Sequence, residues 1–177
     1  MEKTKWVADP VHSEILFKVK HLMISTITGH FKVFKVVAET DTDDFNTTSS
    51  IVFTAAIASV ETNNADRNKH LQDAEFFNEE KFPELKFVTK KYVGNSVEAT
   101  LHGDLTIRDI TKPVFVKVEF GGIAVDPYGQ TKAGFTIEAK ISRKEFGLVY
   151  GPITEAGGVV IGDEVKIHGE IQLIKQI

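Results

Sequence analysis

The chain of 177 residues contains no cysteine, so disulfide bonds, thiolate metal ligands and cysteine nucleophiles are all excluded. Long hydrophobic runs are also absent. No segment approaches the roughly 18 apolar residues that a membrane-spanning helix needs, and no signal-peptide pattern follows the first residues. We therefore expect no stable membrane insertion. The expected location is the cytoplasm, or the periplasm if this chain is a processed form.

Tryptophan, tyrosine and excess charge of one sign are scarce as well. One Trp and three Tyr stand against 13 Phe, and the formal net charge is −4. Basic residues such as Lys90 and Lys91 occur in pairs among acidic residues rather than in a stripe, so nucleic acid is not an expected partner. Phenylalanine rings carry no polar group, and their abundance favours a dry interior.

The composition is that of one folded domain. Hydrophobic residues make up 42% of the chain and charged residues 26%, which excludes disordered and fibrous classes. A chain of this length buries roughly two thirds of its unfolded surface and is too short for two ordinary domains. We predict a single domain over residues 1–177.

Strict alternation of apolar and polar residues, the period of a half-buried β-strand, recurs along most of the chain. Between residues 96 and 107, for example, Ala99, Leu101 and Leu105 alternate with polar residues. This pattern indicates antiparallel strands with one face in water. Closing a barrel or stacking two sheets would hide the strand edges, and periodicity does not choose between them. About eight strands are predicted, at residues 15–21, 31–39, 51–57, 85–92, 96–107, 114–120, 133–141 and 165–173.

One stretch, residues 63–78, has helical rather than alternating character. Asn64 or Asp66 can cap a helix there. Apolar residues follow at helical spacing, which predicts one or two short helices. These apolar residues are Leu71, Ala74 and Phe77.

Glycine marks the other irregular segments. Residues 145–162 are glycine-rich and predict a long loop, a kind of segment that is often functional. Shorter turns are expected at residues 94–96 and from Gly121-Gly122 to Gly129.

The predicted inward faces mix large side chains with small ones. Small residues can leave room for a ligand, or they can fit the taper of a barrel that is filled by its own side chains. Composition leaves both alternatives open. The small residues are Ala55, Ala99, Gly103, Ala133, Ala139 and Gly169.

The motifs of common enzymes are missing. There is no His-Glu-x-x-His zinc helix, no Gly-x-Ser-x-Gly nucleophile turn and no phosphate loop ending in Gly-Lys-Ser/Thr. His168 and Glu170 match half of a zinc-deaminase signature whose other half needs two cysteines. We predict no metal site, no catalytic residue and no enzymatic activity.

Two histidines keep an enzymatic alternative open. His21 ends an alternating segment and should face inward, where a lone histidine is more often a hydrogen-bonded core residue than a catalytic one. His70 follows Asp66 and Arg67 by about one helical turn, which predicts a hydrogen-bond cluster on the helix. Either His21 or the Asp66/His70 pair would supply the acid or base of an enzyme.

Short segments spread over almost the whole chain match one known pattern. They are Trp6, Asp9-Pro-Val-His12-Ser13, Val19-Lys-His21-Leu22-Met23, Gly29-His-Phe31, Arg67-Asn68-Lys-His70-Leu71, Glu75-Phe76-Phe77, Gly103-Asp-Leu105-Thr106-Ile107, Thr111-Lys-Pro113-Val114, Gly134-Phe135, Ile141-Ser-Arg143-Lys-Glu145-Phe146-Gly147 and Ile161-Gly162-Asp163-Glu-Val165. In this order they resemble the YceI-like family of lipocalin-like, lipid-binding barrels. Asn68, Asp73 and Glu75 depart from the residues that the family often has there, so the helical corner is expected to hydrogen-bond differently.

The resemblance implies an all-β fold: an extended, eight-stranded antiparallel barrel with a short helical insertion around residues 64–78. It implies non-enzymatic binding, transport or storage of a long-chain amphiphile, such as a polyisoprenoid or an isoprenoid quinone, with no other cofactor. Family members are often dimers, so a homodimer is an expected state. The rivals are a lipid- or quinone-handling enzyme that uses His21 or the Asp66/His70 pair, and an interaction module with a filled barrel.

Strand alternation within such a barrel predicts which side chains would line the ligand cavity. The helical corner would close one end through Phe77. The predicted ligand-binding residues are Phe17, Val19, Phe31, Phe53, Phe77, Phe87, Leu101, Leu105, Phe120, Phe135, Ile137 and Ile167.

Overall fold

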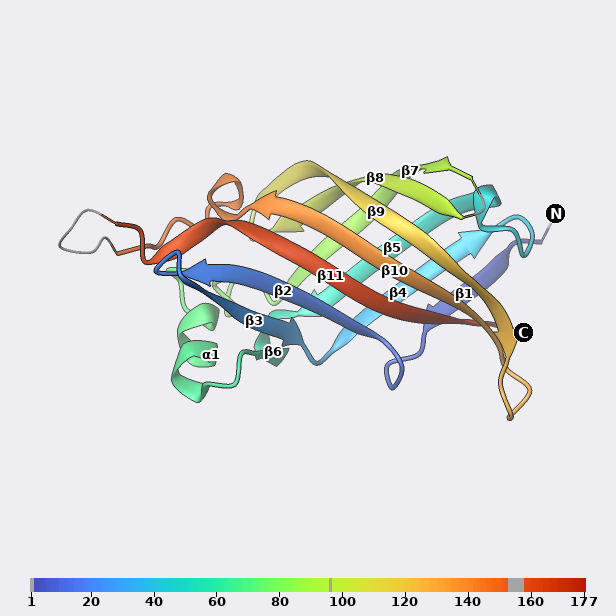
Figure 1. The fold of residues 1–177 in the computed structure, drawn as a ribbon, viewed down its shortest axis with the longest axis horizontal. Helices are drawn as coiled ribbons and strands as arrows, with labels where there is room; N and C mark the ends of the chain where they lie inside the picture. The colour runs from blue at the N-terminus through green and yellow to red at the C-terminus, as the bar shows by residue number, and fades with distance from the viewer. Residues whose placement is uncertain (1, 96, 153–157) are drawn as a thin grey trace.

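A computed structural model describes residues 2–95, 97–152 and 158–177, and in this part of the chain eleven strands form one antiparallel sheet that closes on itself (Figure 1). One α-helix and three short 3₁₀ helices connect them. The strands are β1 (Thr4–Ala8), β2 (Glu14–His21), β3 (Ser25–Phe31), β4 (Phe34–Thr40), β5 (Thr48–Ala56), β6 (Val60–Glu61), β7 (Glu84–Gly94), β8 (Glu98–Ile107), β9 (Ile110–Val125), β10 (Thr131–Ser142) and β11 (Ile161–Lys175). The helices are η1 (Phe45–Thr47), η2 (Ile57–Ser59), α1 (Ala65–Gln72) and η3 (Arg143–Phe146).

The ring is closed by the last strand. Its order is β1-β4-β5-β7-β8-β9-β10-β11, and β11 returns to β1. The end of β11 pairs with β1, with Trp6 opposite Lys175, whereas its beginning pairs with β2, with Phe17 opposite Ile167. Strands β2, β3 and β6 extend the wall on that side. The prediction of a closed, eight-stranded antiparallel barrel is confirmed.

Alternation predicted the strand faces well where the strand is regular. In β8 every second residue from Ala99 to Ile107 is buried, and the residues between them are not. This is the burial pattern of a strand with one face toward the core and one toward water.

Of the turn predicted from Gly121-Gly122 to Gly129, the first part is wrong, because β9 continues through both glycines to Val125. The register with β10 shifts at this point: Gly134 pairs with Gly122 and Phe135 with Phe120. The glycines therefore form a β-bulge, a common use of glycine inside a strand. The second part is confirmed: the chain reverses between residues 126 and 130, where Asp126 Oδ1 accepts hydrogen bonds from the backbone N–H groups of Tyr128 and Gln130.

The predicted helix is shorter than its apolar spacing suggested. Asn64 is the N-cap, and its Oδ1 accepts a hydrogen bond of 2.9 Å from the backbone N–H of Arg67. The helix ends at Gln72, because Asp73 is extended, with ψ 166°. Ala74 and Phe77 lie in the turns that follow.

The glycine-rich segment of 145–162 is mostly irregular, as predicted, between η3 and β11. Ser96, in the turn predicted at 94–96, and residues 153–157 lie outside the described residues.

One end of the barrel is packed solid. This is the end at which both chain termini lie (Figure 1). Trp6 is fully buried and its Nε1 donates a hydrogen bond of 3.0 Å to Thr40 Oγ1. The ring of Phe45, carried by η1, packs on Trp6 at 4.8 Å and on Phe135 at 4.8 Å between centroids. The opposite end, beside α1, is the one at which a ligand could enter.

Candidate functional site

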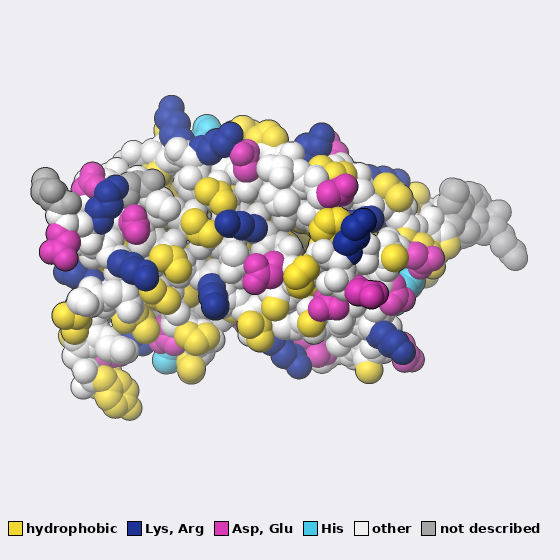
Figure 2. Space-filling view, turned by 180° about the vertical axis from the view of Figure 1, so that it is seen from behind, with side chains coloured by type: hydrophobic (Ala, Val, Ile, Leu, Met, Phe, Trp, Pro, Cys, Tyr) yellow, Lys and Arg dark blue, Asp and Glu magenta, His cyan; other side chains and the backbone are white. Residues whose placement is uncertain are grey.

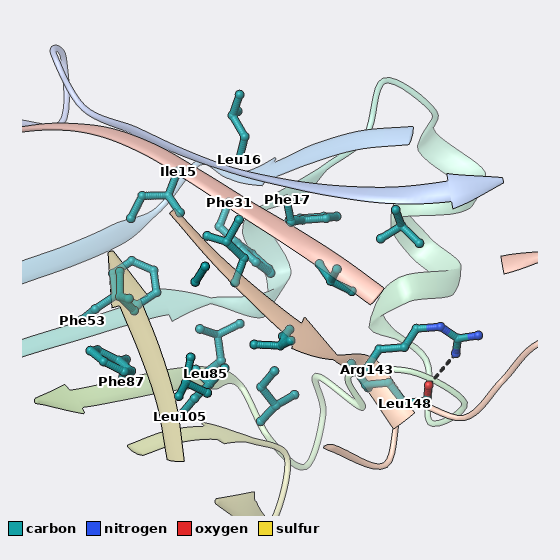
Figure 3. A pocket seen from close by; sticks show the side chains of 18 of the residues that line it. Ile15, Leu16, Phe17, Phe31, Phe53, Leu85, Phe87, Leu105, Arg143 and Leu148 are labelled. Carbon is teal, nitrogen blue, oxygen red and sulfur yellow. Dashed lines mark hydrogen bonds between the residues drawn. The ribbon is translucent and has the colours of Figure 1, made fainter. Parts of the chain in front are cut away.

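The interior of the barrel contains a cavity of about 520 Å³. This volume lies within the range of about 300–1,000 Å³ that is typical of small-molecule sites. In Figure 3 the side chains of Phe31, Phe53, Phe87 and Leu105 project from separate strands toward this space. The lining is apolar through most of its length, as a site for a hydrophobic chain requires.

Most of the residues predicted from strand alternation do line this cavity. Phe77 lies after α1, and its ring contacts that of Phe31 at a centroid distance of 5.9 Å. Whether these side chains touch a ligand stays a prediction. The predicted residues that line the cavity are Phe17, Val19, Phe31, Phe53, Phe77, Phe87, Leu101, Leu105, Phe135, Ile137 and Ile167.

Phe120 is the one predicted ligand-binding residue that does not line the cavity. Its ring packs against Phe45 at 5.8 Å and against Phe135 at 5.3 Å between centroids. It belongs to the packed end of the barrel, because η1 brings Phe45 over it. The sequence does not reveal that an irregular segment contributes a ring to the barrel core.

Tyr92 is a lining residue that alternation did not predict. Counting inward positions from Leu85 and Phe87 in β7 would turn Lys91 inward, but the register with β8 shifts between Thr89 and Lys91. The extra residue places Tyr92 opposite the buried Leu101 and into the cavity lining.

The phenol group of Tyr92 is the polar group of the deep half of the cavity. Within residues 2–95, 97–152 and 158–177 its hydroxyl has no hydrogen-bond partner. Burial raises the pKa of Tyr92, and the carboxylate of Asp44 raises it further. This hydroxyl is therefore free to bond an oxygen atom of a ligand.

Small residues on the inward faces make room for rings that lie along the wall. A Cβ atom on Gly29 would stand 2.4 Å from Cζ of Phe17, and one on Gly103 would stand 2.5 Å from Cζ of Phe87. Neither glycine leaves an empty pocket of its own. Because each ring lies over a glycine, it occupies less of the central space, and the lumen stays open.

The cavity opens at the α1 end. Lys20 and Pro152 line it and are exposed, so the cavity reaches the molecular surface between them. His21, which faces the cavity as expected, lies at this mouth with His70 and Tyr150. The polar lining residues thus gather at the open end, apart from Tyr92 at the deep end.

Arg67 is fixed at the mouth by Thr62. Its Nε donates a hydrogen bond of 2.9 Å to Thr62 Oγ1, and Nη2 donates to the carbonyl oxygen of the same residue. Asn68 Oδ1 accepts from the backbone N–H of Thr62 at 2.8 Å, which ties α1 to the residue after β6. Two of the five guanidinium donors are used in this way, so the others remain for a ligand.

His70 is held by a different carboxylate from the one that the sequence suggested. Its Nε2 lies 2.7 Å from Glu75 Oε2, and its ring packs edge-on against Phe76 at 5.0 Å and Tyr150 at 4.9 Å. Asp66 is exposed and forms no ion pair with His70 in the described part of the chain. The proposed Asp66/His70 acid–base pair is therefore not assembled, because the turn after α1 brings Glu75 back to the ring.

Arg143 stabilises the barrel wall beside the cavity mouth. It is buried, and its guanidinium donates to four backbone carbonyl groups; the contact with Leu148 is drawn in Figure 3. Burial lowers the pKa of Arg143, while the nearby carboxylate of Asp163 opposes this effect. Arg143 thus joins η3, the following loop and the start of β11. The accepting groups are the carbonyls of Leu148, Tyr150, Ile161 and Gly162.

Other kinds of site find no support among the described side chains. No group of three His, Asp or Glu residues there could hold a metal ion. No helix in the same residues is long and apolar enough to cross a membrane.

The fold and cavity define the class of protein: a closed antiparallel β-barrel around an apolar lumen that is open at one end. Comparison with known proteins identifies the family. The chain belongs to the YceI-like family, because residues 6–173 match the YceI-like domain. The resemblance noted in the sequence is confirmed.

Relatives and solved structures agree with this assignment. A UPF0312 protein of Staphylococcus epidermidis is 38% identical over 172 residues, which cover 96% of each chain. The crystal structure of the Campylobacter jejuni YceI protein has a TM-score of 0.75 at 31% identity and covers 89% of this chain and 90% of that one. A polyisoprenoid binding domain from Saccharophagus degradans has a TM-score of 0.68 at 13% identity, over 97% and 98% of the two chains, and shows the shared fold.

Proposed function

We propose that this protein binds a long-chain amphiphilic lipid, of the polyisoprenoid or isoprenoid-quinone type, inside the barrel and carries or stores it without changing it chemically. The observation that supports this is the apolar lining of the 520 Å³ cavity, with polar groups gathered at its open end. The protein of the same fold from Saccharophagus degradans is named a polyisoprenoid binding domain, which also supports it.

The lining supplies most of the binding free energy in this proposal. Each methylene group that leaves water gains about 0.8 kcal/mol, so ten of them gain about 8 kcal/mol before the costs of ordering. A long hydrocarbon chain therefore needs few polar contacts. Burying a polar head group in the apolar lumen without hydrogen bonds would cost free energy. This favours a ligand with one long apolar part.

The mouth would hold the polar end of the ligand. Arg67 is anchored through Thr62 and keeps free donors. A guanidinium with free donors suits phosphate or carboxylate oxygens, and His70 and Tyr150 offer further polar contacts beside it. The apolar chain would then extend toward Phe45 at the packed end of the barrel.

The first test is to extract natively purified protein with organic solvent and to analyse the extract by mass spectrometry, beside native mass spectra of the intact protein. We expect a stoichiometric long-chain lipid. A protein that is empty and also refuses isoprenoid and fatty-acid probes would contradict the proposal and favour the interaction module.

A pair of variants in β10 distinguishes an effect on the cavity from a general effect on folding. Ala139 lines the cavity, whereas its neighbour Glu138 is exposed. We expect Ala139→Phe to lower lipid occupancy by filling the lumen, and Glu138→Phe to leave occupancy unchanged. Equal occupancy in both folded variants would show that the lipid lies elsewhere.

A second pair tests the polar end. Arg67→Gln removes the free donors at the mouth, while Lys69→Gln removes an exposed charge from the same helix. We expect only Arg67→Gln to weaken the binding of an anionic lipid and to spare that of a neutral one. Equal losses for both lipids would count against the assigned head-group position.

A further inference from the structure

The turn between β2 and β3 places apolar side chains in water on a strained backbone. Leu22 and Met23 have positive φ angles of 53° and 60°, and the backbone N–H of Ile24 donates to the carbonyl of His21 at 3.2 Å. Two successive residues of this kind form a type I′ turn, for which Asn-Gly is the favoured sequence. Leu22, Met23 and Ile24 are 41%, 59% and 83% exposed. Neither the backbone conformation nor burial explains why apolar side chains occupy these three positions.

More exposed apolar residues adjoin this turn. The backbone N–H of Leu22 donates to the carbonyl of Val160 at 2.7 Å, which places the exposed Val159 beside the turn. Val149 is also exposed, between the lining residues Leu148 and Tyr150. These residues surround the cavity mouth and are called the apolar rim, which consists of Leu22, Met23, Ile24, Val149 and Val159.

The adjoining outer wall carries a row of lysines. Lys18 on β2 is opposite Lys166 on β11, which is in turn opposite Lys140 on β10. All three are exposed, and none has an ion pair within the described ranges of the chain. The carboxylates of Glu138 and Glu170 approach His168 instead, at 3.5 and 3.0 Å.

Like charges directly opposite one another destabilise a sheet, so the lysine row is a cost to the fold. By contrast, the face shown in Figure 2 carries basic and acidic side chains interspersed. A row of one sign next to an exposed apolar rim is the arrangement by which proteins bind anionic membrane surfaces.

We propose that the apolar rim and the lysine row dock the barrel on a lipid bilayer that contains anionic phospholipids, with the cavity mouth against the bilayer. Lys18 is four residues before Leu22, or about 13 Å along an extended strand. Apolar side chains at an interface reach about 5–10 Å into the bilayer. When the rim is inserted, the lysine ammonium groups therefore lie near the phosphates. Lipid can then pass between the bilayer and the lumen without crossing water. This role of the docking surface rests on the proposed function.

The test measures co-sedimentation of the purified protein with vesicles of phosphatidylcholine alone and of phosphatidylcholine with phosphatidylglycerol. The key variant is Leu22→Asn with Met23→Gly. It removes apolar surface and supplies the residues that a type I′ turn prefers, so the thermal midpoint should stay or rise. We expect partition onto the mixed vesicles to fall at least about tenfold.

The matched control removes exposed apolar residues from the opposite end of the barrel. Val125→Ser with Tyr128→Ser should leave vesicle binding unchanged, because the turn between β9 and β10 lies at the end of the barrel opposite α1 (Figure 1). Equal binding by the rim variant and the wild type would overturn the docking proposal.

The contribution of charge is tested separately. Lys18→Gln with Lys166→Gln should reduce partition onto the mixed vesicles by about tenfold and abolish their advantage over phosphatidylcholine. Lys35→Gln with Lys86→Gln removes the same charge from β4 and β7, the two neighbours of β5, and should have little effect. Equal losses in both double variants would mean that net charge, rather than the lysine row, drives binding. A protein that holds lipid but ignores vesicles would refute docking alone, while an empty protein that binds vesicles would refute the cargo alone.

Discussion

The carboxylate of Asp9 and the ammonium group of Lys132, 123 positions apart in the chain, are 2.8 Å from each other. Asp9 lies in the corner between β1 and β2, and Lys132 lies at the start of β10. His12 Nδ1 approaches the same carboxylate oxygen at 2.8 Å, and the backbone N–H of Val11 donates to the other at 3.0 Å. The Asp-Pro-Val-His segment of the family pattern is thus a structural corner of the barrel.

Removing this carboxylate should loosen the corner without touching the cavity. The contacts with Lys132 and His12 hold the pKa of Asp9 well below its ordinary value, against the opposing effect of burial. We expect Asp9→Asn to lower the thermal midpoint by several degrees at neutral pH, measured by circular dichroism, and to leave lipid occupancy intact. Loss of lipid from a folded variant would show that the corner also shapes the cavity.

The same contact gives a defined pH dependence. A carboxylate with a depressed pKa in the folded state stabilises the protein above its unfolded pKa of about 3.9, and this contribution disappears as the pH falls toward the folded pKa. The difference in unfolding free energy between wild type and Asp9→Asn should therefore be present at neutral pH and shrink below about pH 4. A constant difference down to pH 2 would contradict the assignment of the shift to Asp9.

The difference in stability between the wild type and Tyr92→Phe should depend on pH in the alkaline range. Its raised pKa means that the unfolded chain loses this proton first, so stability falls as the pH rises above about 10. Tyr92→Phe removes a hydroxyl without a partner and should be as stable as the wild type at pH 7. It should be the more stable of the two above about pH 10, in urea titrations at each pH. A large loss at pH 7 would reveal a hydrogen bond of the hydroxyl in solution.

The buried guanidinium of Arg143 should be the most sensitive single position of the mouth. Its removal leaves carbonyl groups of the loop and of β11 without donors. We expect Arg143→Met to cost about 3 kcal/mol in urea unfolding, and Arg143→Lys to restore little, since one ammonium group cannot span these acceptors. The exposed neighbour Lys144 provides the control, because Lys144→Met should change stability by less than about 0.5 kcal/mol.

Gly29 offers a test of how the lumen is kept open. A methyl group there meets the ring of Phe17, which must swing away from the wall and into the cavity. Gly29→Ala should therefore reduce lipid occupancy and cost about 1–3 kcal/mol. Gly134→Ala is the matched control, because a Cβ at that glycine meets no atom within 4 Å. Similar behaviour of the two variants would argue against the ring displacement.

The sequence predicted the parts of this structure that depend on local regularity. Alternation in β8 identified Leu101 and Leu105 as inward, and Asn64 is one of the two helix caps that the sequence predicts. Bulges could not be foreseen, because a single extra residue reverses every later side chain in the strand without altering composition. This is why Tyr92 was missed and why Gly121 was assigned to a turn.

Contacts between segments that are far apart in the sequence could not be predicted from periodicity, for a different reason. Nothing in the order of residues says that η1 places Phe45 on Phe120, or that Glu75 rather than Asp66 meets His70. Such pairs follow from the closed ring and from the turn after α1. The family pattern supplied the barrel and its helical corner, but not the partners of the residues at its mouth.

The pairing of β11 with three other strands has a consequence for biosynthesis. Because β11 is one of the two neighbours of β10, β1 and β2, the ring is not closed and no lumen exists before residues 161–175 have been made. The earlier hairpins can form during translation, yet the first and last strands of the ring must wait for each other. Any hydrophobic guest must therefore be taken up after translation has passed this strand, so cargo loading and barrel closure are late events in the life of the polypeptide.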